Sequence, residues 1–131
     1  ITGTFQKGLY ENLFTGDSLE EWMKVFVADL KDGQYDEQLV YSRKLLKKVD
    51  EYVGNVPPHV KAAKMLEKPG KMIKYVMTSR GPVPAELSPK DFDYQHYIDK
   101  QLGPVADIYM GLNGQKFENL FKAHQLSLFD F

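Results

Sequence analysis

The residues of this sequence that could do chemistry near neutral pH are its three histidines, His59, His96 and His124. None of them has a second ligand at the spacing of a metal site, and the carboxylates are scattered over expected helix surfaces. The sequence contains no glycine-rich phosphate loop, no nucleophile elbow and no HExxH motif. We therefore expect no catalytic site, no metal site and no cofactor within this chain.

The charge pattern favours binding instead. Ten of the seventeen Lys and Arg residues fall between Arg43 and Arg80, against three acidic residues, which gives this stretch a net charge of +7. The whole chain sums to −1, so both ends are acidic. A basic stretch of this kind is typical of a surface that binds a polyanion such as nucleic acid.

The elements that must position these residues indicate an α+β fold that is mostly α. Apolar spacing predicts a helical hairpin over residues 4–32, which places Trp22 in the core, and helices over 93–122 that divide at Gly103-Pro104. Between them we expect a basic strand-helix-strand over residues 39–79, a small antiparallel β element. Residues 80–84 contain two prolines, so we expect a loop there.

One helix of the basic stretch is expected over residues 59–67, after Pro57-Pro58. Its first turn could hold a phosphate beside His59 and Lys61, because unpaired backbone N–H groups point outward there. The alternative is that His59 merely caps its own helix.

Length and composition set the class of protein. A chain of 131 residues with 43% hydrophobic and 13% aromatic residues should fold as one domain around one core. It has no cysteine and no apolar run of membrane-spanning length, and its first residues lack the basic head and apolar stretch of a signal peptide, so we expect a cytoplasmic protein. The chain begins with Ile1 and not with Met, so we expect that it was either processed or cut from a longer protein, and the residues discussed below favour the second.

The last residues form an apolar peptide at residues 124–131. A soluble domain should not leave Leu128 and Phe129 exposed without a purpose. Two apolar anchors preceded by Gln125 suit a shallow pocket on another protein. The alternative is that the peptide folds back onto its own domain.

Three groups of residues carry a resemblance to a known family. The first contains Leu39-Val40, Lys44-Leu45-Leu46-Lys47, Tyr52, Pro58-His59-Val60 and Ala62-Ala63-Lys64; the second contains Gly70, Ile73, Tyr75-Val76, Gly81-Pro82 and Pro84; and the third contains Tyr94, His96-Tyr97-Ile98, Gln101-Leu102 and Pro104-Val105-Ala106. In order and spacing these groups resemble the thumb region of family B DNA polymerases over residues 1–123.

The resemblance implies roles for particular residues. It places Lys47 and His59 at positions where the family meets the DNA backbone, and Lys44, Lys48, Lys61, Lys71 and Lys74 are expected to support them by charge and neighbourhood. The tail carries a Gln-Leu-x-Leu-Phe motif that is similar to the peptide by which bacterial polymerases bind the β sliding clamp. Its residues here are Gln125, Leu126, Leu128 and Phe129.

The resemblance also implies what the chain lacks. The family's catalytic aspartates and Mg²⁺ lie in the palm domain, whose motifs are absent here. As partners we expect primer–template duplex DNA, the β clamp and the palm, fingers and exonuclease domains, in the cytoplasm at the bacterial nucleoid. The alternative function is a small non-catalytic module that binds RNA, single strands or a protein, with the tail as a second docking peptide.

Overall fold

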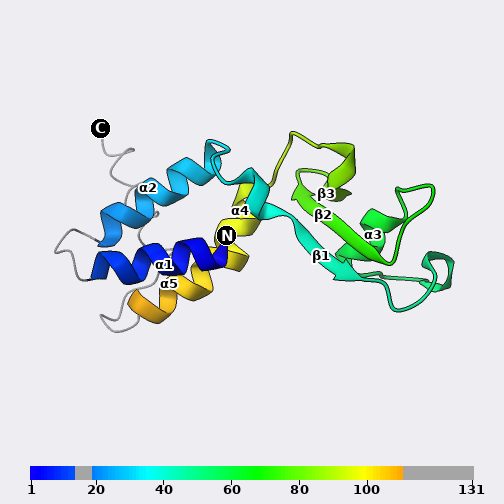
Figure 1. The fold of residues 1–131 in the computed structure, drawn as a ribbon, viewed down its shortest axis with the longest axis horizontal. Helices are drawn as coiled ribbons and strands as arrows, with labels where there is room; N and C mark the ends of the chain where they lie inside the picture. Colours follow the sequence, from blue (N-terminus) through cyan, green and yellow to red (C-terminus); the bar gives the residue numbers. More distant parts are fainter. Residues whose placement is uncertain (14–18, 111–131) are drawn as a thin grey trace. The chain divides into compact units, whose positions relative to one another are not determined.

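The computed structural model describes residues 1–13 and 19–110, and it divides the chain into two compact units (Figure 1). One unit contains Ile1–Tyr35 together with the described residues from Gln95 onward, and the other contains Asp36–Tyr94. The length of the chain led us to expect a single core. The middle of the sequence instead forms a unit of its own, and the two ends of the described chain fold together.

The first unit is helical. Helix α1 (Thr2–Leu13) packs against helix α2 (Leu19–Lys31), which confirms the predicted hairpin. The ring of Phe5 lies edge-on to that of Phe26 at 5.0 Å between centroids, a favourable aromatic geometry. The buried apolar side chains of this unit are Phe5, Leu9, Met23, Phe26, Val27, Leu30, Tyr97, Ile98, Leu102, Ala106 and Met110.

Gly8 allows the two helices of the hairpin to approach closely. Its Cα lies under the indole of Trp22, and a Cβ built there would lie 2.5 Å from Cη2 and closer still to Cζ2. Trp22, predicted to be a core residue, is half-buried over this glycine. Only glycine leaves room for the indole at this point.

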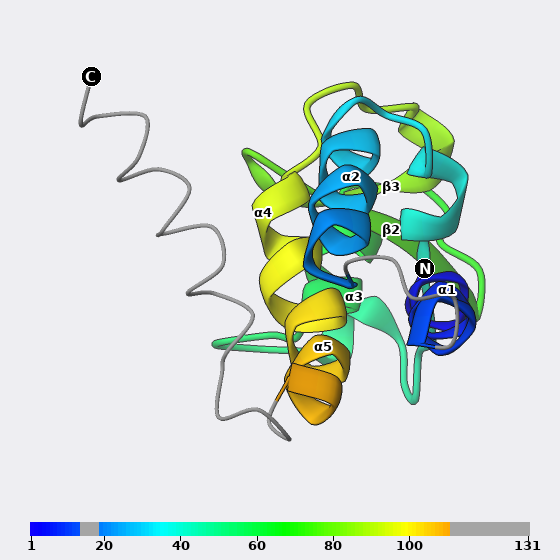
Figure 2. The same cartoon turned by 90° about the vertical axis from the view of Figure 1, so that its left-hand side faces the viewer.

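A third helical segment completes the unit. Helix α4 (Tyr94–Tyr97) continues through a π-helical turn (Ile98–Leu102) into helix α5 (Gly103–Met110), and Figure 2 shows the three as one run. The sequence predicted a kink or a break at Gly103-Pro104. The widened turn lies directly before Pro104, where the proline removes a backbone donor and its ring crowds the preceding turn.

The second unit contains a three-stranded antiparallel sheet in the order β1-β2-β3. The fold of the described residues is therefore α+β and mostly α, as predicted. The elements of this unit are a 3₁₀ turn (Asp36–Leu39), β1 (Tyr41–Lys44), a 3₁₀ turn (Val49–Glu51), α3 (Pro58–Ala63), β2 (Met72–Thr78), β3 (Gly81–Pro84) and a 3₁₀ turn (Ala85–Leu87). The predicted second strand is confirmed, whereas the first strand and α3 are shorter than expected.

Strand β3 corrects the expected loop at residues 80–84. In the register of β3 with the central strand β2, Pro82 lies opposite Met77 and Pro84 lies opposite Tyr75. Successive N–H groups of a strand point to opposite edges, so two prolines at alternate positions both direct their missing donors away from β2. The prolines are compatible with the ladder because β3 is an edge strand.

Helix α3 covers one face of this sheet. Its Ala62 and Ala63 pack with Ile73 and Tyr75 of β2 in a buried cluster, and Figure 1 shows the helix against the strands. The ring of Tyr41 stacks on that of Tyr75 at 5.2 Å, across the β1–β2 pair. This small core fixes the loops at the ends of the strands.

Some predictions concern residues outside the described ranges. They are residues 14–18 of the predicted hairpin, residues 111–122 of the helices predicted over 93–122, and the tail at residues 124–131.

Candidate nucleic-acid interface

A groove of about 840 Å³ lies on the second unit, and two segments of the basic stretch line it. One segment is residues 44–50, which start at the last residue of β1. The other contributes Lys64, Leu66, Glu67 and residues 69–71, from the stretch that leads from α3 into β2. The lysines of the groove are Lys44, Lys47, Lys48, Lys64 and Lys71, and its acidic residues are Asp50 and Glu67. All five lysines are exposed to solvent, so their charges face any ligand that enters.

Antiparallel pairing brings the two segments together. Lys44 lies opposite Met72 in the β1–β2 register, and the Leu45 N–H donates a hydrogen bond of 2.7 Å to the Lys71 carbonyl. Lysines that are 27 positions apart in the sequence therefore face one groove. Charge alone predicted both residues, but only the pairing places them at the same site.

Tyr52 holds the loop of the first segment. Its hydroxyl accepts a hydrogen bond of 3.0 Å from the Leu46 N–H, and its ring lies 4.8 Å from the ammonium nitrogen of Lys47. Its backbone carbonyl accepts a 3.1 Å hydrogen bond from Lys64 Nζ. One residue thus contacts both segments and orients two of the groove lysines.

The structure brings together four of the seven predicted DNA contacts, Lys44, Lys47, Lys48 and Lys71. Lys64 joins them, although we had not placed it among the predicted contacts. Its membership of the basic stretch was the signal available in the sequence. Lys64 is the C-cap residue of α3, at the end that leads into the groove.

Lys61 and Lys74 are not part of the groove lining. Lys61 is exposed on α3. Lys74 is exposed on β2 opposite Ser42, and it lines a different cleft with Glu86. A nearby carboxylate reduces the positive potential around Lys74.

His59 is buried in α3, with only 7% of its surface exposed. Burial and, secondarily, the positive charge of Arg43 lower the pKa of His59 below its usual 6.5. The alternative that His59 caps its helix is wrong, because the N-cap residue is Pro57 and no side chain caps the helix. Helix α3 has six residues, too few for us to infer an anion site at its N-terminus.

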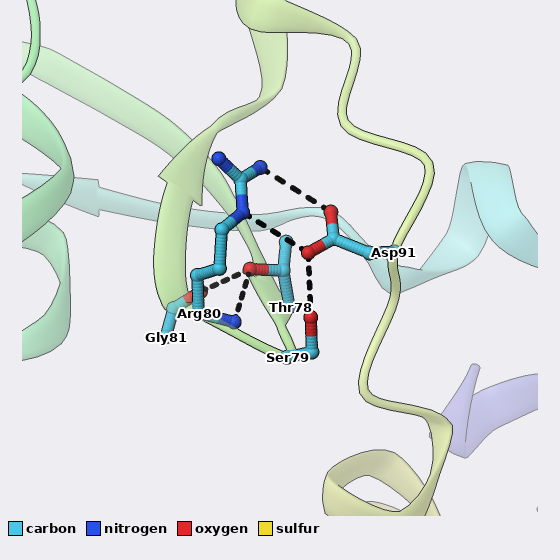
Figure 3. Close-up of polar contacts among 5 residues, drawn as sticks. All are labelled: Thr78, Ser79, Arg80, Gly81 and Asp91. Atoms are coloured by element: carbon cyan, nitrogen blue, oxygen red, sulfur yellow. Dashed lines mark hydrogen bonds and ion pairs between the residues drawn. The ribbon is translucent and has the colours of Figure 1, made fainter.

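Arg80 is paired with a carboxylate (Figure 3). Its Nε lies 3.1 Å from Oδ2 of Asp91 and a terminal nitrogen lies 3.3 Å from Oδ1, while Ser79 Oγ donates to Oδ2 at 2.6 Å. The hydrogen bonds from Arg80 and Ser79 lower the pKa of Asp91 to about 2. Arg80 contributes to the net charge of +7 of the basic stretch, but Asp91, which lies outside that stretch, compensates its charge.

The same network closes the β2–β3 turn. Thr78 Oγ1 accepts from the Arg80 N–H at 3.1 Å and donates to the Gly81 carbonyl at 2.8 Å. The Ser79 N–H donates to the Asp91 carbonyl at 2.9 Å. These contacts join the turn to the segment that precedes α4.

Within the described ranges, no three His, Cys, Asp or Glu side chains are grouped so that they could hold a metal ion. The same ranges contain no helix long and apolar enough to cross a membrane.

Comparison with known proteins identifies the class to which this chain is similar. No family model matches the sequence. Two curated proteins that match it are both DNA polymerases, one bacterial and one archaeal. The predicted resemblance to a fragment of a DNA polymerase is thereby confirmed.

The bacterial relative is DNA polymerase II of Escherichia coli, which is 34% identical over 137 residues. This match covers 95% of the chain and 17% of the polymerase. The DNA polymerase of Methanocaldococcus jannaschii is 31% identical over 141 residues, which cover 94% of the chain and 9% of that protein. The chain spans less than a fifth of the length of either relative.

Proposed function

We propose that this chain is the thumb region of a family B DNA polymerase of the polymerase II type, and that its groove binds the backbone of the primer–template duplex. The observation that carries the proposal is the groove itself, where five exposed lysines from two segments face one space. Two acidic residues offset only part of their charge. The match of 95% of the chain to a DNA polymerase supports the same ligand.

Lysines suit a backbone contact better than a base contact. An ammonium group is a point charge that binds phosphate without reading the sequence, and phosphate contacts fix position and register. The side chains that line the described groove include no aromatic residue on which a base could stack. This composition favours duplex DNA over the alternative module that binds single strands.

The affinity should depend strongly on salt. If the five groove lysines neutralise five phosphates, the logarithm of the affinity falls against the logarithm of salt concentration with a slope of roughly −4 to −5. The test is a titration of a fluorescent primer–template duplex and of the matching single strand, each at several KCl concentrations. A flat salt response, or tighter binding of the single strand, would refute the proposal.

We assign the phosphate contacts first to Lys44, Lys47, Lys48, Lys64 and Lys71, because these lysines line one groove. Lys61, Lys74 and His59 do not line this groove, and in this proposal they are secondary DNA contacts. His59 would act as a neutral hydrogen-bonding group, since its lowered pKa leaves the imidazole uncharged at neutral pH.

The tail is proposed to bind the β sliding clamp through Gln125, Leu126, Leu128 and Phe129. Calorimetry with a bacterial β clamp tests this, beside a variant with Leu128→Ala and Phe129→Ala. Micromolar binding that the variant loses would support the assignment, and no binding by either form would refute it. A thumb contact and a clamp tether would together raise processivity, because the tether keeps the local DNA concentration high.

In the parent polymerase, nucleotidyl transfer would take place outside this chain. The palm would hold Mg²⁺, and the fingers and the exonuclease would complete the enzyme in the bacterial cytoplasm. In this proposal the chain binds the duplex and takes no part in the chemical step. Substitutions in it should therefore change DNA affinity and processivity more than the rate of nucleotidyl transfer.

A further inference from the structure

The groove contains an exposed apolar side chain among its lysines. Leu46 is 89% exposed, and it lies in the loop between Lys44 and Lys47. A single exposed leucine is normal on a protein surface. Leu46 differs from such a residue because it lines the groove to which the basic side chains point.

The backbone of Leu46 is held in place. Its N–H donates a 3.0 Å hydrogen bond to the hydroxyl of Tyr52, and the ammonium nitrogen of Lys47 lies 4.8 Å from the centroid of the Tyr52 ring. Two residues after Leu46, Lys48 donates its N–H to the Glu51 carboxylate at 3.2 Å. An apolar side chain on a fixed backbone loses less entropy on binding than one on a free loop, so it is preorganised for a contact.

The charges around Leu46 select the partner. Five lysines against two acidic residues favour a polyanion over an ordinary apolar protein surface. Between successive phosphates, a DNA duplex presents the carbon atoms of deoxyribose along the edges of the minor groove. Proteins place apolar side chains such as leucine in the minor groove, next to basic residues on the phosphates.

We propose that Leu46 packs against deoxyribose carbons at the minor-groove edge of a duplex whose phosphates the groove lysines bind. This inference rests on the proposed function and adds an uncharged contact to it. The contact is to sugar, because the groove that Leu46 lines has no aromatic residue on which a base could stack.

The test compares Leu46→Ser with Val53→Ser in the 131-residue chain, using a fluorescent primer–template duplex. Val53 is 83% exposed and does not line the groove, so it is a matched aliphatic control. We expect Leu46→Ser to weaken binding about five- to tenfold, the effect of burying roughly half of a leucine side chain or more. Val53→Ser should leave the affinity unchanged.

The salt dependence separates this contact from the phosphate contacts. Leu46→Ser removes no charge, so its slope against salt should equal that of the wild type, whereas Lys47→Ala should reduce the slope by about 1. Leu46→Met should retain the affinity, since it keeps the apolar volume. Equal melting temperatures for these variants would show that the fold is unchanged.

Each outcome decides between the two proposals. If Leu46→Ser binds as tightly as the wild type while Lys47→Ala is weakened, the sugar contact is refuted and the phosphate contacts stand. If Leu46→Ser and Val53→Ser weaken binding equally, the contact is not specific to Leu46 and is also refuted. If the wild-type chain does not bind the duplex at low salt, the proposed function is refuted, and the sugar contact that rests on it is refuted too.

Discussion

Removing charge from the groove should change the salt dependence of DNA binding by a calculable amount. With five lysines on phosphates the slope is about −4.5, and affinity falls about 500-fold between 50 and 200 mM salt. The double variant Lys44→Ala/Lys71→Ala removes one lysine from each segment of the groove. Three phosphate contacts then remain, so the slope should be about −2.7 and the loss over the same range about 40-fold.

The control carries the same change in net charge at a different place. Lys7 and Lys100 are exposed lysines of the helical unit, so Lys7→Ala/Lys100→Ala alters the total charge without altering the groove. Fluorescence anisotropy with a primer–template duplex, at four or more KCl concentrations, gives the slope for each protein. The groove variant should differ from the wild type by about 1.8 in slope, and the control by less than about 0.5.

Equal slopes for the two double variants would refute the reasoning. They would show that the duplex responds to the net charge of the chain, or lies elsewhere on it, and that the five lysines do not contact phosphates together. A groove variant with an unchanged slope but a weaker affinity would equally contradict the assignment, because it would show a loss of packing without a loss of counterion release.

Three further predictions concern stability. Gly8→Ala should lower the stability of the helical hairpin by about 1–3 kcal/mol, because the added Cβ would clash with Trp22. Gly3→Ala is the control, since a Cβ at Gly3 would have nothing within 4 Å. Thermal unfolding compares the two variants, and equal melting temperatures would contradict the close approach. The Asp91 carboxylate should stabilise the fold above pH 3.8, and this contribution should disappear as pH falls toward about 2; urea unfolding of Asp91→Asn should lack that part of the pH dependence. The pKa of His59 is lower in the folded chain than in the unfolded chain, so as pH falls the histidine is protonated in the unfolded chain before it is protonated in the folded one. The stability of the fold should therefore decrease as pH falls below 6.5. A His59→Gln variant that keeps this pH dependence would contradict the assignment.

The sequence predicted the elements whose signals are local. Strand β2 (Met72–Thr78) was predicted from alternation, and the irregular turn before Pro104 was predicted from the proline, because proline acts within its own turn. The loop predicted at residues 80–84 was wrong for a related reason. The rule that proline stops a ladder holds for a central strand, and only the sheet order reveals that β3 is an edge.

The sequence could not predict which residues share the groove, because contacts between residues that are distant in the sequence bring them together. The pairing of Arg80 with Asp91 spans a proline-rich segment, and no spacing rule connects the two positions. Lys64 joins the groove because α3 ends there, and Tyr52 orients the loop through three different groups. A charge count could find the lysines, but it could not separate those that share a groove from those that do not.

The alternate prolines of β3 also determine how this sheet can meet other chains. An edge strand with free N–H groups can accept a further strand, either from a partner peptide or from another copy in aggregation. Pro82 and Pro84 remove the outward donors along this edge, so a foreign strand would find acceptors there and no matching donors. The three-stranded sheet is thus protected against extension past β3, which leaves β1 as the edge that could still pair with another strand.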